Sequence, residues 1–321
     1  MASDVVEIRG LVKRFGDVVA VDGLDLAIHA GECFGLLGPN GAGKTTTIEI
    51  LEGLQDPTGG DVRVLGLTWA REGRAIRERI GVQLQETVLE GKLTVLETLR
   101  LFSSFYPRPR PLPEVLHEVG LEEKSSAWVR NLSGGQRQRL AVGCALVCDP
   151  EILFLDEPTT GLDPAARRGL WDVIRRFQAR GRTVVLTTHY MDEAERLCDR
   201  IAIVDRGRVV ALGTPGELVA RVGGEEVVEI ETVPPLPAAT LSAVDGVRSA
   251  RADGQGWRLV VAGLARTLPA LLAAVAASGA SPVRLATRHA TLEDVFLAVA
   301  GRRFEEAERA AAGPQGAGAS A

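Results

Sequence analysis

The stretch GPNGAGKT, residues 38–45, constrains the fold of this chain more than any other part of its sequence. It fits the pattern G-x-x-x-x-G-K-[ST] and stands between a strand-like segment, ECFGLLG, and a helical one, KTTTIEILEGL. Its glycines let consecutive backbone N–H groups converge on one oxyanion, and the helix adds its positive end. Lys44 supplies an ammonium group for the outer phosphates of a nucleotide, and the Thr45 hydroxyl can hold Mg²⁺. A glycine-rich turn that binds nothing would leave this lysine without a purpose.

From Leu140 onward, uniformly apolar strands alternate with helices. The helix RLAVGCALV is followed by the strand EILFLDE, the helix AARRGLWDVIRRFQARG, the strand TVVLTTH and the helix MDEAERLC. The segment IAIVDRGRVVALG then predicts a hairpin that turns at residues 205–207. This alternation predicts an α/β fold whose parallel sheet is buried on both faces.

Two consecutive carboxylates, Asp156 and Glu157, end the strand EILFLDE. Ligands gather at the carboxyl ends of parallel strands, so we expect Asp156 to point at the Mg²⁺ held by Thr45. Glu157 is expected to orient or deprotonate an attacking water, because the turn at Pro158 can redirect its side chain. His189 ends the next strand at the same edge and could contact a γ-phosphate. Each of these side chains alone could be a solvated surface residue, but their shared edge favours a site.

The segment NLSGGQRQRL, residues 131–140, offers a second place for an anion. The Ser133 hydroxyl and the backbone of Gly134 and Gly135 precede a helical run, which suits a terminal phosphate. A serine cap followed by two turn-forming glycines explains the same backbone equally well. Asp163 before Pro164 is an N-cap with proline at the first helical position, and a role between sites is compatible with capping. For both segments the structural and the functional interpretation stay open.

Charge and hydropathy narrow the class of protein. The formal net charge of -5 gives no general attraction to nucleic acid, and we expect no nucleic-acid partner. The acidic N-terminus MASDVVEIRG does not resemble a secretory signal, and no apolar run approaches the roughly 18 residues that span a bilayer. The cysteines are interpreted as buried small side chains, although Cys144 and Cys148 could share a helix face and bind metal. We expect a soluble chain that borrows any membrane part from another polypeptide.

The pattern of predicted strands and helices changes after about Gly224. EEVVEIETV, VRSARA and WRLVVAG are strand-like, TLPALLAAVAASG is helical, and TLEDVFLAVAG predicts a last helix with a capping box of Thr291 and Asp294. The predicted order is strand, possible helix, strand, strand, helix, strand and helix, which indicates a small α+β domain. We therefore expect a first domain over residues 1–224, an accessory domain over 225–303 and a disordered tail over 304–321.

Over roughly its first 220 residues, the chain resembles the ATP-binding cassette family of transport ATPases. The resemblance rests on four motifs that occur in this order: GPNGAGKTT, LSGGQRQRL, ILFLDEPTTGLD and TTH. The resemblance implies a P-loop NTPase cassette with an antiparallel β subdomain and a helical subdomain, and it implies ATP and Mg²⁺ as cofactors. Gln85 in GVQLQET matches the family's glutamine loop, which contributes to the metal or water site and senses the membrane subunit. Phe15 occupies the place of the aromatic residue, usually tyrosine, that stacks on adenine.

The resemblance assigns roles residue by residue. It implies nucleotide contacts for Phe15, Asn40, Gly41, Ala42, Gly43, Lys44, Thr45, Thr46, Ser133, Gly134, Gly135, Gln136 and Asp163, metal contacts for Thr45, Gln85 and Asp156, and catalysis by Glu157 and His189. In that family two cassettes pair head to tail, and the LSGGQ segment of one closes over the ATP held by the other. This chain carries one of each element, so it needs a second copy or a homologous cassette. Hydrolysis removes the shared γ-phosphate and lets the dimer open.

The trailing segment ATLEDVFLAVAGR, together with IGVQLQET and KLTVLETL, resembles the bacterial drug-resistance exporter ATPases of the daunorubicin/doxorubicin type. This resemblance implies a separate integral membrane permease of the ABC-2 type and the efflux of drugs or natural products. It also implies a cytoplasmic chain that is peripheral on the inner face of the cell membrane. A soluble ABC-type ATPase that regulates a non-transport process stays open as the alternative. The accessory domain could serve dimer contact, regulation or substrate binding.

Overall fold

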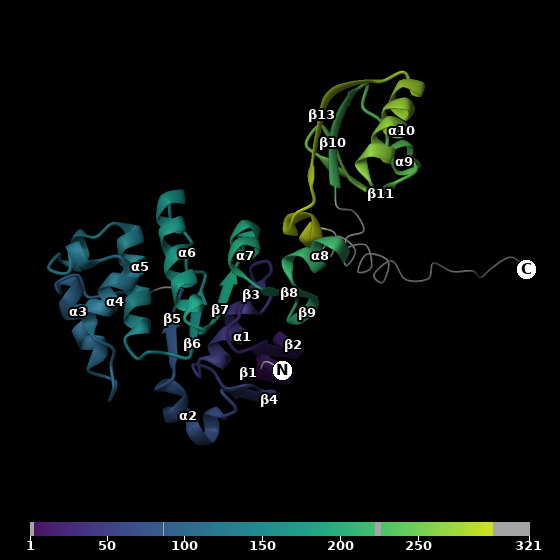
Figure 1. Cartoon of the computed structure of the whole chain (residues 1–321). Helices are drawn as coiled ribbons and strands as arrows, with labels where there is room; N and C mark the ends of the chain where they lie inside the picture. Colours follow the sequence, from purple (N-terminus) through teal and green to yellow (C-terminus); the bar gives the residue numbers. More distant parts are fainter. Residues whose placement is uncertain (1–2, 86, 222–225, 298–321) are drawn as a thin grey trace, which may run out of the picture. The chain divides into compact units, whose positions relative to one another are not determined.

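The computed structural model describes residues 3–85, 87–221 and 226–297. The chain forms two compact units, which divide between Leu212 and Gly213 (Figure 1). The domain boundaries at residues 224 and 303 stay a prediction, and the tail predicted over residues 304–321 lies outside the described residues.

The first unit contains a six-stranded sheet with the strand order β5-β6-β7-β3-β8-β9. Its strands are β3 (Cys33–Leu37), β5 (Ile80–Gln83), β6 (Ile152–Asp156), β7 (Thr183–Thr188), β8 (Arg200–Asp205) and β9 (Arg208–Gly213). The pairings from β5 to β8 are parallel, and β3, β6 and β7 consist entirely of buried residues. The β8–β9 hairpin is as predicted, because Arg206 and Gly207 both adopt the positive φ of a tight two-residue turn.

A three-stranded antiparallel sheet, ordered β2-β1-β4, shares its hydrophobic core with the six-stranded sheet. Its strands are β1 (Asp4–Phe15), β2 (Val18–His29) and β4 (Gly59–Val64). The common core includes Val6 and Ile28 from this sheet, Ile48 from helix α1, and Phe34 and Phe154 from the six-stranded sheet. The antiparallel β subdomain implied by the resemblance is therefore present.

Helices surround the six-stranded sheet. Those described in the first unit are α1 (Lys44–Leu51), α2 (Trp69–Arg77), α3 (Val95–Ser103), α4 (Leu112–Val119), α5 (Gly134–Leu146), α6 (Pro164–Ala179) and α7 (Met191–Leu197). Short 3₁₀ helices occupy Glu122–Lys124 and Val129–Asn131. Figure 1 shows α3, α4 and α5 gathered at the β5 edge of the sheet, where they form the helical subdomain. Within the described residues, no helix has the length and apolar character that crossing a bilayer requires.

The sequence of the segment YPRPRPLP, residues 106–113, predicts a loop between helices, because proline fits neither a helix interior nor a central strand. In the structure this segment connects α3 to α4. This prediction covers Pro107, Pro109, Pro111 and Pro113, and it is wrong for Pro113, which lies in the first turn of α4. A backbone N–H in that turn has no partner within the helix, so proline there removes no hydrogen bond.

The second unit contains a four-stranded antiparallel sheet with the order β11-β12-β10-β13. Its elements are α8 (Pro215–Arg221), β10 (Glu226–Val233), α9 (Ala238–Ser242), β11 (Val247–Asp253), β12 (Gly256–Val261), α10 (Leu264–Ala277) and β13 (Ser281–His289). Leu241 of α9 and Leu271 and Val275 of α10 pack with Val228 and Leu259 of the sheet. From β10 onward, the observed order agrees with the predicted α+β order.

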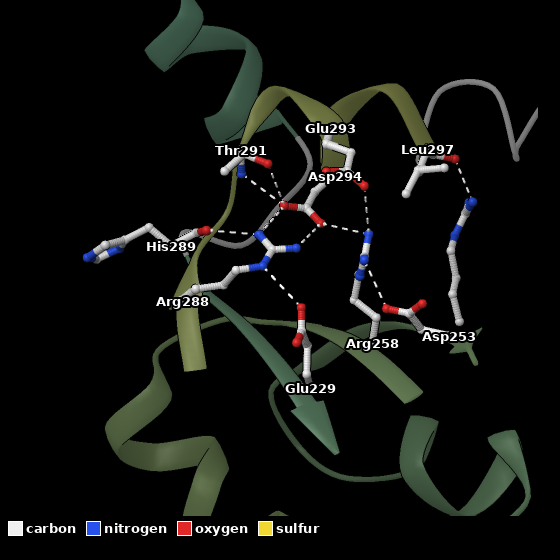
Figure 2. A network of polar contacts seen from close by, with 10 residues as sticks. Glu229, Asp253, Arg258, Arg288, His289, Thr291, Glu293, Asp294 and Leu297 are labelled. Atoms are coloured by element: carbon white, nitrogen blue, oxygen red, sulfur yellow. Dashed lines mark hydrogen bonds and ion pairs between the residues drawn. The ribbon is translucent and has the colours of Figure 1, made fainter. Parts of the chain in front are cut away.

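A polar network holds the last described helix, residues 292–297, to this sheet (Figure 2). Arg288 donates to both carboxylate oxygens of Asp294, at 2.7 and 2.9 Å, and to Glu229 at 3.3 Å. Burial alone would raise the pKa of Asp294, but the bonds from Arg288 and Thr291 hold that pKa below its ordinary value. The Asp294 carboxylate accepts from the Thr291 N–H at 2.9 Å, which confirms this half of the predicted capping box.

Candidate functional site

The glycine-rich loop joins β3 to α1, as its sequence predicts, and α1 begins at Lys44. Two of its glycines are required by packing as well as by phosphate binding. A Cβ on Gly38 would lie 2.2 Å from the carbonyl oxygen of Val204, and one on Gly43 would lie 2.4 Å from that of Ala20. Gly43 also has a φ of 99°, which only glycine adopts readily. The loop is thus held against the backbones of β2 and β8, which fixes where its N–H groups point.

Lys44 lies inside this loop and is 4% exposed. Its ammonium donates to the carbonyl oxygens of Gly38 at 2.9 Å and Pro39 at 3.1 Å, and its Nζ lies 4.0 Å from Oε1 of Glu157. Burial lowers the pKa of Lys44, although Glu157 and Asp156 oppose this effect. An ammonium has three donors, so two carbonyl bonds leave one N–H for an anionic oxygen.

A cavity of about 510 Å³ opens over the loop, which is an ordinary size for a small-molecule site. The predicted residues that line it are Phe15, Asn40, Gly41, Gly43, Lys44, Thr45, Thr46, Gln85 and Glu157. Phe15 is 47% exposed and is available for stacking, with the Lys13 ammonium 4.9 Å from its ring centroid. Val18, Val19 and Ala20 of β2 line the same cavity and are missing from the prediction.

Asp156 and Thr45 meet at the carboxyl edge of the sheet, as expected from the strand order. Thr45 Oγ1 donates to Asp156 Oδ1 at 3.5 Å, and Thr187 donates to the same oxygen. Burial raises the pKa of Asp156, and a bound cation would reverse that effect. One carboxylate and one hydroxyl suit Mg²⁺, which takes few protein ligands and completes its shell with water and phosphate oxygens. With Gln85 lining the adjacent cavity, the residues present fit the predicted metal site.

Glu157 turns back toward the phosphate loop through its own backbone. Its φ is 46°, a left-handed conformation that is uncommon outside glycine and is found at functional sites. Its N–H donates to Thr187 Oγ1 at 2.9 Å, and its Oε2 accepts from Thr160 at 3.1 Å. We expected the turn at Pro158 to redirect this side chain, but the unusual backbone conformation lies at Glu157 itself.

His189 lies beside Glu157, with Nδ1 3.2 Å from Oε2. That nitrogen is buried and makes no hydrogen bond of good geometry to another described residue. The structure therefore brings together Lys44, Thr45, Asp156, Glu157 and His189, as the sequence predicts. Thr187 hydrogen-bonds to both acidic residues but is missing from the prediction. The sequence TTH at the end of the strand could have indicated it.

The segment Ser133–Gln136 forms the start of helix α5. The Ser133 hydroxyl accepts from the Gln136 N–H at 3.2 Å, and the Gln136 side chain accepts from the Ser133 N–H at 2.9 Å. This reciprocal capping box confirms the structural interpretation. A Cβ on Gly135 would lie 2.5 Å from Cβ of Ala166, whereas one on Gly134 would have open space. Among the described residues that line the nucleotide cavity, none comes from this segment.

Asp163 caps helix α6, as its sequence predicts. Its carboxylate accepts from the N–H groups of Ala165 at 2.8 Å and Ala166 at 2.9 Å, and these bonds lower the pKa of Asp163. The described lining of the nucleotide cavity does not include Asp163. The start of α6 instead lies against the start of α5, through the close approach of Ala166 to Gly135.

The cysteines are buried in the structure, as interpreted from their surroundings. Burial raises the pKa of the Cys144 thiol to about 12 and that of the Cys148 thiol to about 11, so both stay protonated. Within the described residues, no cluster of three or more His, Cys, Asp or Glu side chains is arranged to hold a metal ion.

Comparisons with known proteins agree with this geometry. Residues 21–160 match the protein-family model described as ABC transporter. The chain is 41% identical over 309 residues to the Nod factor export ATP-binding protein I of Cupriavidus pinatubonensis, an alignment that covers 94% of this chain and 92% of that protein. The corresponding protein of Ralstonia nicotianae is 41% identical over 312 residues, with 95% and 96% covered.

Solved structures agree with the fold. A structure of an ATP binding subunit of an ABC transporter is 31% identical, with a TM-score of 0.61, and covers 68% of this chain and 93% of that chain. The ATP-binding cassette MJ0796, in a dimeric post-hydrolysis state bound to ADP and Pi, is 28% identical. Its TM-score is 0.58, with 65% of this chain and 98% of that chain covered. These similarities confirm the predicted fold class.

Proposed function

This chain belongs to the ABC transporter family as an ATP-binding subunit that hydrolyses ATP with Mg²⁺, and we propose that it drives an exporter as part of a dimer. The proposed partner is a separate integral membrane permease of the ABC-2 type, and the proposed cargo is a drug or natural product. The chain is proposed to be cytoplasmic and to reach the inner face of the membrane through that permease. Two relatives named for Nod factor export support the outward direction.

The phosphate loop and Phe15 would hold the nucleotide. Phe15 lines the cavity and is exposed for stacking on the base, and the N–H groups of the loop would face the phosphates. Lys44 would place its remaining donor on an outer phosphate oxygen. Thr45, Asp156 and Gln85 would hold Mg²⁺, which neutralises charge on the phosphates when it is bound.

Glu157 and His189 are the proposed catalytic residues. Glu157 has one carboxylate oxygen near Lys44 and the other near His189, so it lies between the expected γ-phosphate and the edge of the site. From there it would orient a water for attack and take its proton. His189 would donate from its ring to the γ-phosphate. Thr187 would position both acidic residues through its hydroxyl.

One observation supports the proposed dimer: two segments place glycines at the start of a helix, and among the described residues only the phosphate loop lines the nucleotide cavity. Residues 133–136 present Gly134 to open space at the start of α5. We assign this surface, together with Asp163, to the nucleotide held by a second cassette. The dimeric state of the MJ0796 cassette supports this arrangement.

The function is tested with the membrane protein that we expect to be encoded beside this chain. The two proteins are co-expressed, purified together and reconstituted, and ATP hydrolysis is measured with and without candidate amphiphilic cargo. We expect a stable complex whose hydrolysis rate rises with cargo. Failure of the pair to assemble, together with ATP hydrolysis by the chain alone, would instead favour the regulation of a non-transport process.

A further inference from the structure

Glu193 lies in the first turn of α7, and none of it is exposed to solvent. Its Oε1 accepts from the indole N–H of Trp171 in α6 at 2.9 Å. A hydrogen bond from the side chain of Thr188, the last residue of β7, also reaches this carboxyl group. A carboxyl group is costly to bury, so its place next to the residue before His189 requires an explanation.

The Thr188 hydroxyl connects Glu193 to the turn that carries His189. Thr188 Oγ1 accepts from the Tyr190 N–H at 3.0 Å, so it joins the residues on either side of the histidine. A hydroxyl has a single hydrogen to donate, and here the carboxyl group of Glu193 receives it. The Tyr190 ring lies 4.1 Å from the His189 ring, centroid to centroid. Holding Thr188 and Tyr190 in place therefore also holds the imidazole.

The same carboxyl group lies near the loop that follows Glu157. Thr159, in this loop between β6 and α6, is close enough to Glu193 to lower the pKa of its carboxyl group. Glu193 Oε2 and Thr159 Oγ1 are both buried, and neither makes a hydrogen bond of good geometry to a described residue. A carboxyl group and a hydroxyl can pair in either direction, so a small shift of the loop would satisfy both atoms. Glu193 therefore lies between neighbours of both proposed catalytic residues.

The surroundings of Glu193 favour hydrogen bonding over charge. Burial is the largest influence and raises the pKa of Glu193, although hydrogen bonds and the charge of Arg167 oppose it. The Arg167 guanidinium is itself engaged elsewhere, 3.7 Å from the Asp192 carboxylate and 4.3 Å from the centroid of the Tyr190 ring. A neutral carboxyl group, like an amide, can both donate and accept. A link between an indole N–H and two hydroxyls requires both abilities.

A simpler role for Glu193, a bond that only ties α6 to α7, accounts for Trp171 but not for the two hydroxyls. Thr188 and Thr159 come from different parts of the chain, and each is close in sequence to a proposed catalytic residue. We propose that Glu193 is a positioning residue, which by hydrogen bonding fixes the turn that presents His189 to the γ-phosphate. The inference rests on the proposed function, because it takes the catalytic role of His189 from it.

Glu193→Leu and Glu193→Gln together test the proposal. Leucine fills the space without polar atoms, so kcat for ATP hydrolysis is expected to fall about tenfold or more, since a displaced catalytic group loses rate steeply. ATP affinity should stay within about twofold of the wild type, because the described lining of the nucleotide cavity does not include Glu193. Glutamine keeps a donor and an acceptor, so Glu193→Gln should hydrolyse ATP within about threefold of the wild-type rate.

The His189 ring reports its own position by nuclear magnetic resonance. The chain has 4 histidines, so a histidine-labelled sample gives few ring signals, and His189→Ala identifies the one that belongs to residue 189. With Mg²⁺ and a non-hydrolysable ATP analogue, Glu193→Leu is expected to shift that signal and leave the others in place. Glu193→Gln should leave them all in place. A bond that only tied α6 to α7 would change the melting temperature without moving the His189 signal selectively.

Two further variants complete the design. Thr188→Val keeps the shape and removes the hydroxyl, so it should lose hydrolysis as Glu193→Leu does, and it decides the question if Glu193→Leu does not fold. Glu118 is the matched control, because it is also a buried glutamate but accepts from two arginines, at 2.6 and 3.2 Å. Glu118→Gln should keep the wild-type hydrolysis rate and the wild-type His189 signal.

The outcomes separate this inference from the proposed function. If His189→Ala hydrolyses ATP at the wild-type rate, the proposed role of His189 fails and the inference fails with it. If His189→Ala loses hydrolysis but Glu193→Leu, or Thr188→Val in its place, keeps the wild-type rate or an unshifted His189 signal, the inference is wrong and the proposed function stands. An equal loss from Glu193→Gln and Glu193→Leu would also overturn the inference, because hydrogen bonding would then not be the property that matters.

Discussion

The phosphate loop and the segment 133–136 begin from the same local chemistry and end with different surroundings. Both place glycines at the start of a helix, α1 in one case and α5 in the other. Around the first, the chain supplies a buried lysine, two acidic residues, a histidine and a cavity of about 510 Å³. The second is closed by its own capping box and presents Gly134 to open space.

The comparison shows that a helix N-terminus with glycines is only part of a catalytic site. What makes the phosphate loop a reaction centre is the convergence of β3, β6 and β7, which brings in acidic and basic side chains far apart in the sequence. The segment 133–136 has the donors for a phosphate but no catalytic side chains of its own. We propose that it is one half of a site whose other half belongs to a second cassette.

Of the changes predicted here, Glu157→Gln should have the largest effect on ATP hydrolysis. A small effect would contradict the contrast between the phosphate loop and the segment 133–136. The amide cannot take a proton from water, so ATP hydrolysis is expected to fall by about 10²- to 10⁴-fold while ATP affinity is retained. Steady-state hydrolysis and nucleotide titration measure the two quantities. Glu151→Gln, one residue before the start of the same strand, is the control and should hydrolyse ATP at the wild-type rate. Equal rates for both variants would refute the catalytic role of Glu157.

The two glycines of the second segment should separate function from stability. Gly134→Ala adds a methyl group to open space, so the fold should be unchanged while hydrolysis falls about tenfold or more, since the methyl group meets the partner's nucleotide. Gly135→Ala forces its Cβ against Ala166 and should cost about 1–3 kcal/mol of unfolding free energy. Urea unfolding and hydrolysis assays test both variants. If Gly134→Ala hydrolyses ATP at the wild-type rate, the proposal that residues 133–136 contact the partner's nucleotide is wrong.

Changes at Phe15 test where the base of ATP lies in the cavity at the phosphate loop. Phe15→Ala is expected to weaken ATP binding by roughly tenfold through lost stacking, whereas Phe15→Tyr should bind ATP as the wild type does. Fluorescent-nucleotide titration gives both affinities. Phe105→Ala, a change at another exposed aromatic residue, is the control. If Phe15→Ala binds ATP normally, the base lies elsewhere in the cavity.

A smaller effect is expected in the pH dependence of stability. The site at the phosphate loop contains a buried carboxyl group, that of Asp156, whereas the segment 133–136 contains no acidic residue. The pKa of Asp156 in the folded chain lies above its value in the unfolded chain. Its contribution is therefore fully present below about pH 3.8 and is lost as pH rises through the folded value. Asp156→Asn should melt about 2–4 °C above the wild type at pH 7.5 without nucleotide, with a smaller difference at pH 4.5. A larger difference at pH 4.5 would contradict this assignment.

The sequence predicts much of the first site because its motif carries the local geometry. The strand, loop and helix around residues 38–45, the parallel sheet and the contact of Asp156 with Thr45 all follow from pattern and spacing. The left-handed backbone of Glu157 and the bonds of Thr187 do not, because they depend on how β6 and β7 pack. Likewise, no local pattern reveals that the carboxylate oxygens of Glu52 are buried with no hydrogen-bond partner among the described residues, since this burial comes from packing with residues distant in the sequence.

The central claim is that one ATP is held by two chains, by the phosphate loop of one and by residues 133–136 of the other. The most direct measurement is the mass of the Glu157→Gln variant in solution with Mg²⁺ and ATP, determined by light scattering and repeated with ADP. We predict a stable dimer with ATP and a monomer with ADP. A variant that stays monomeric with ATP, even when the membrane protein is supplied, would contradict the account.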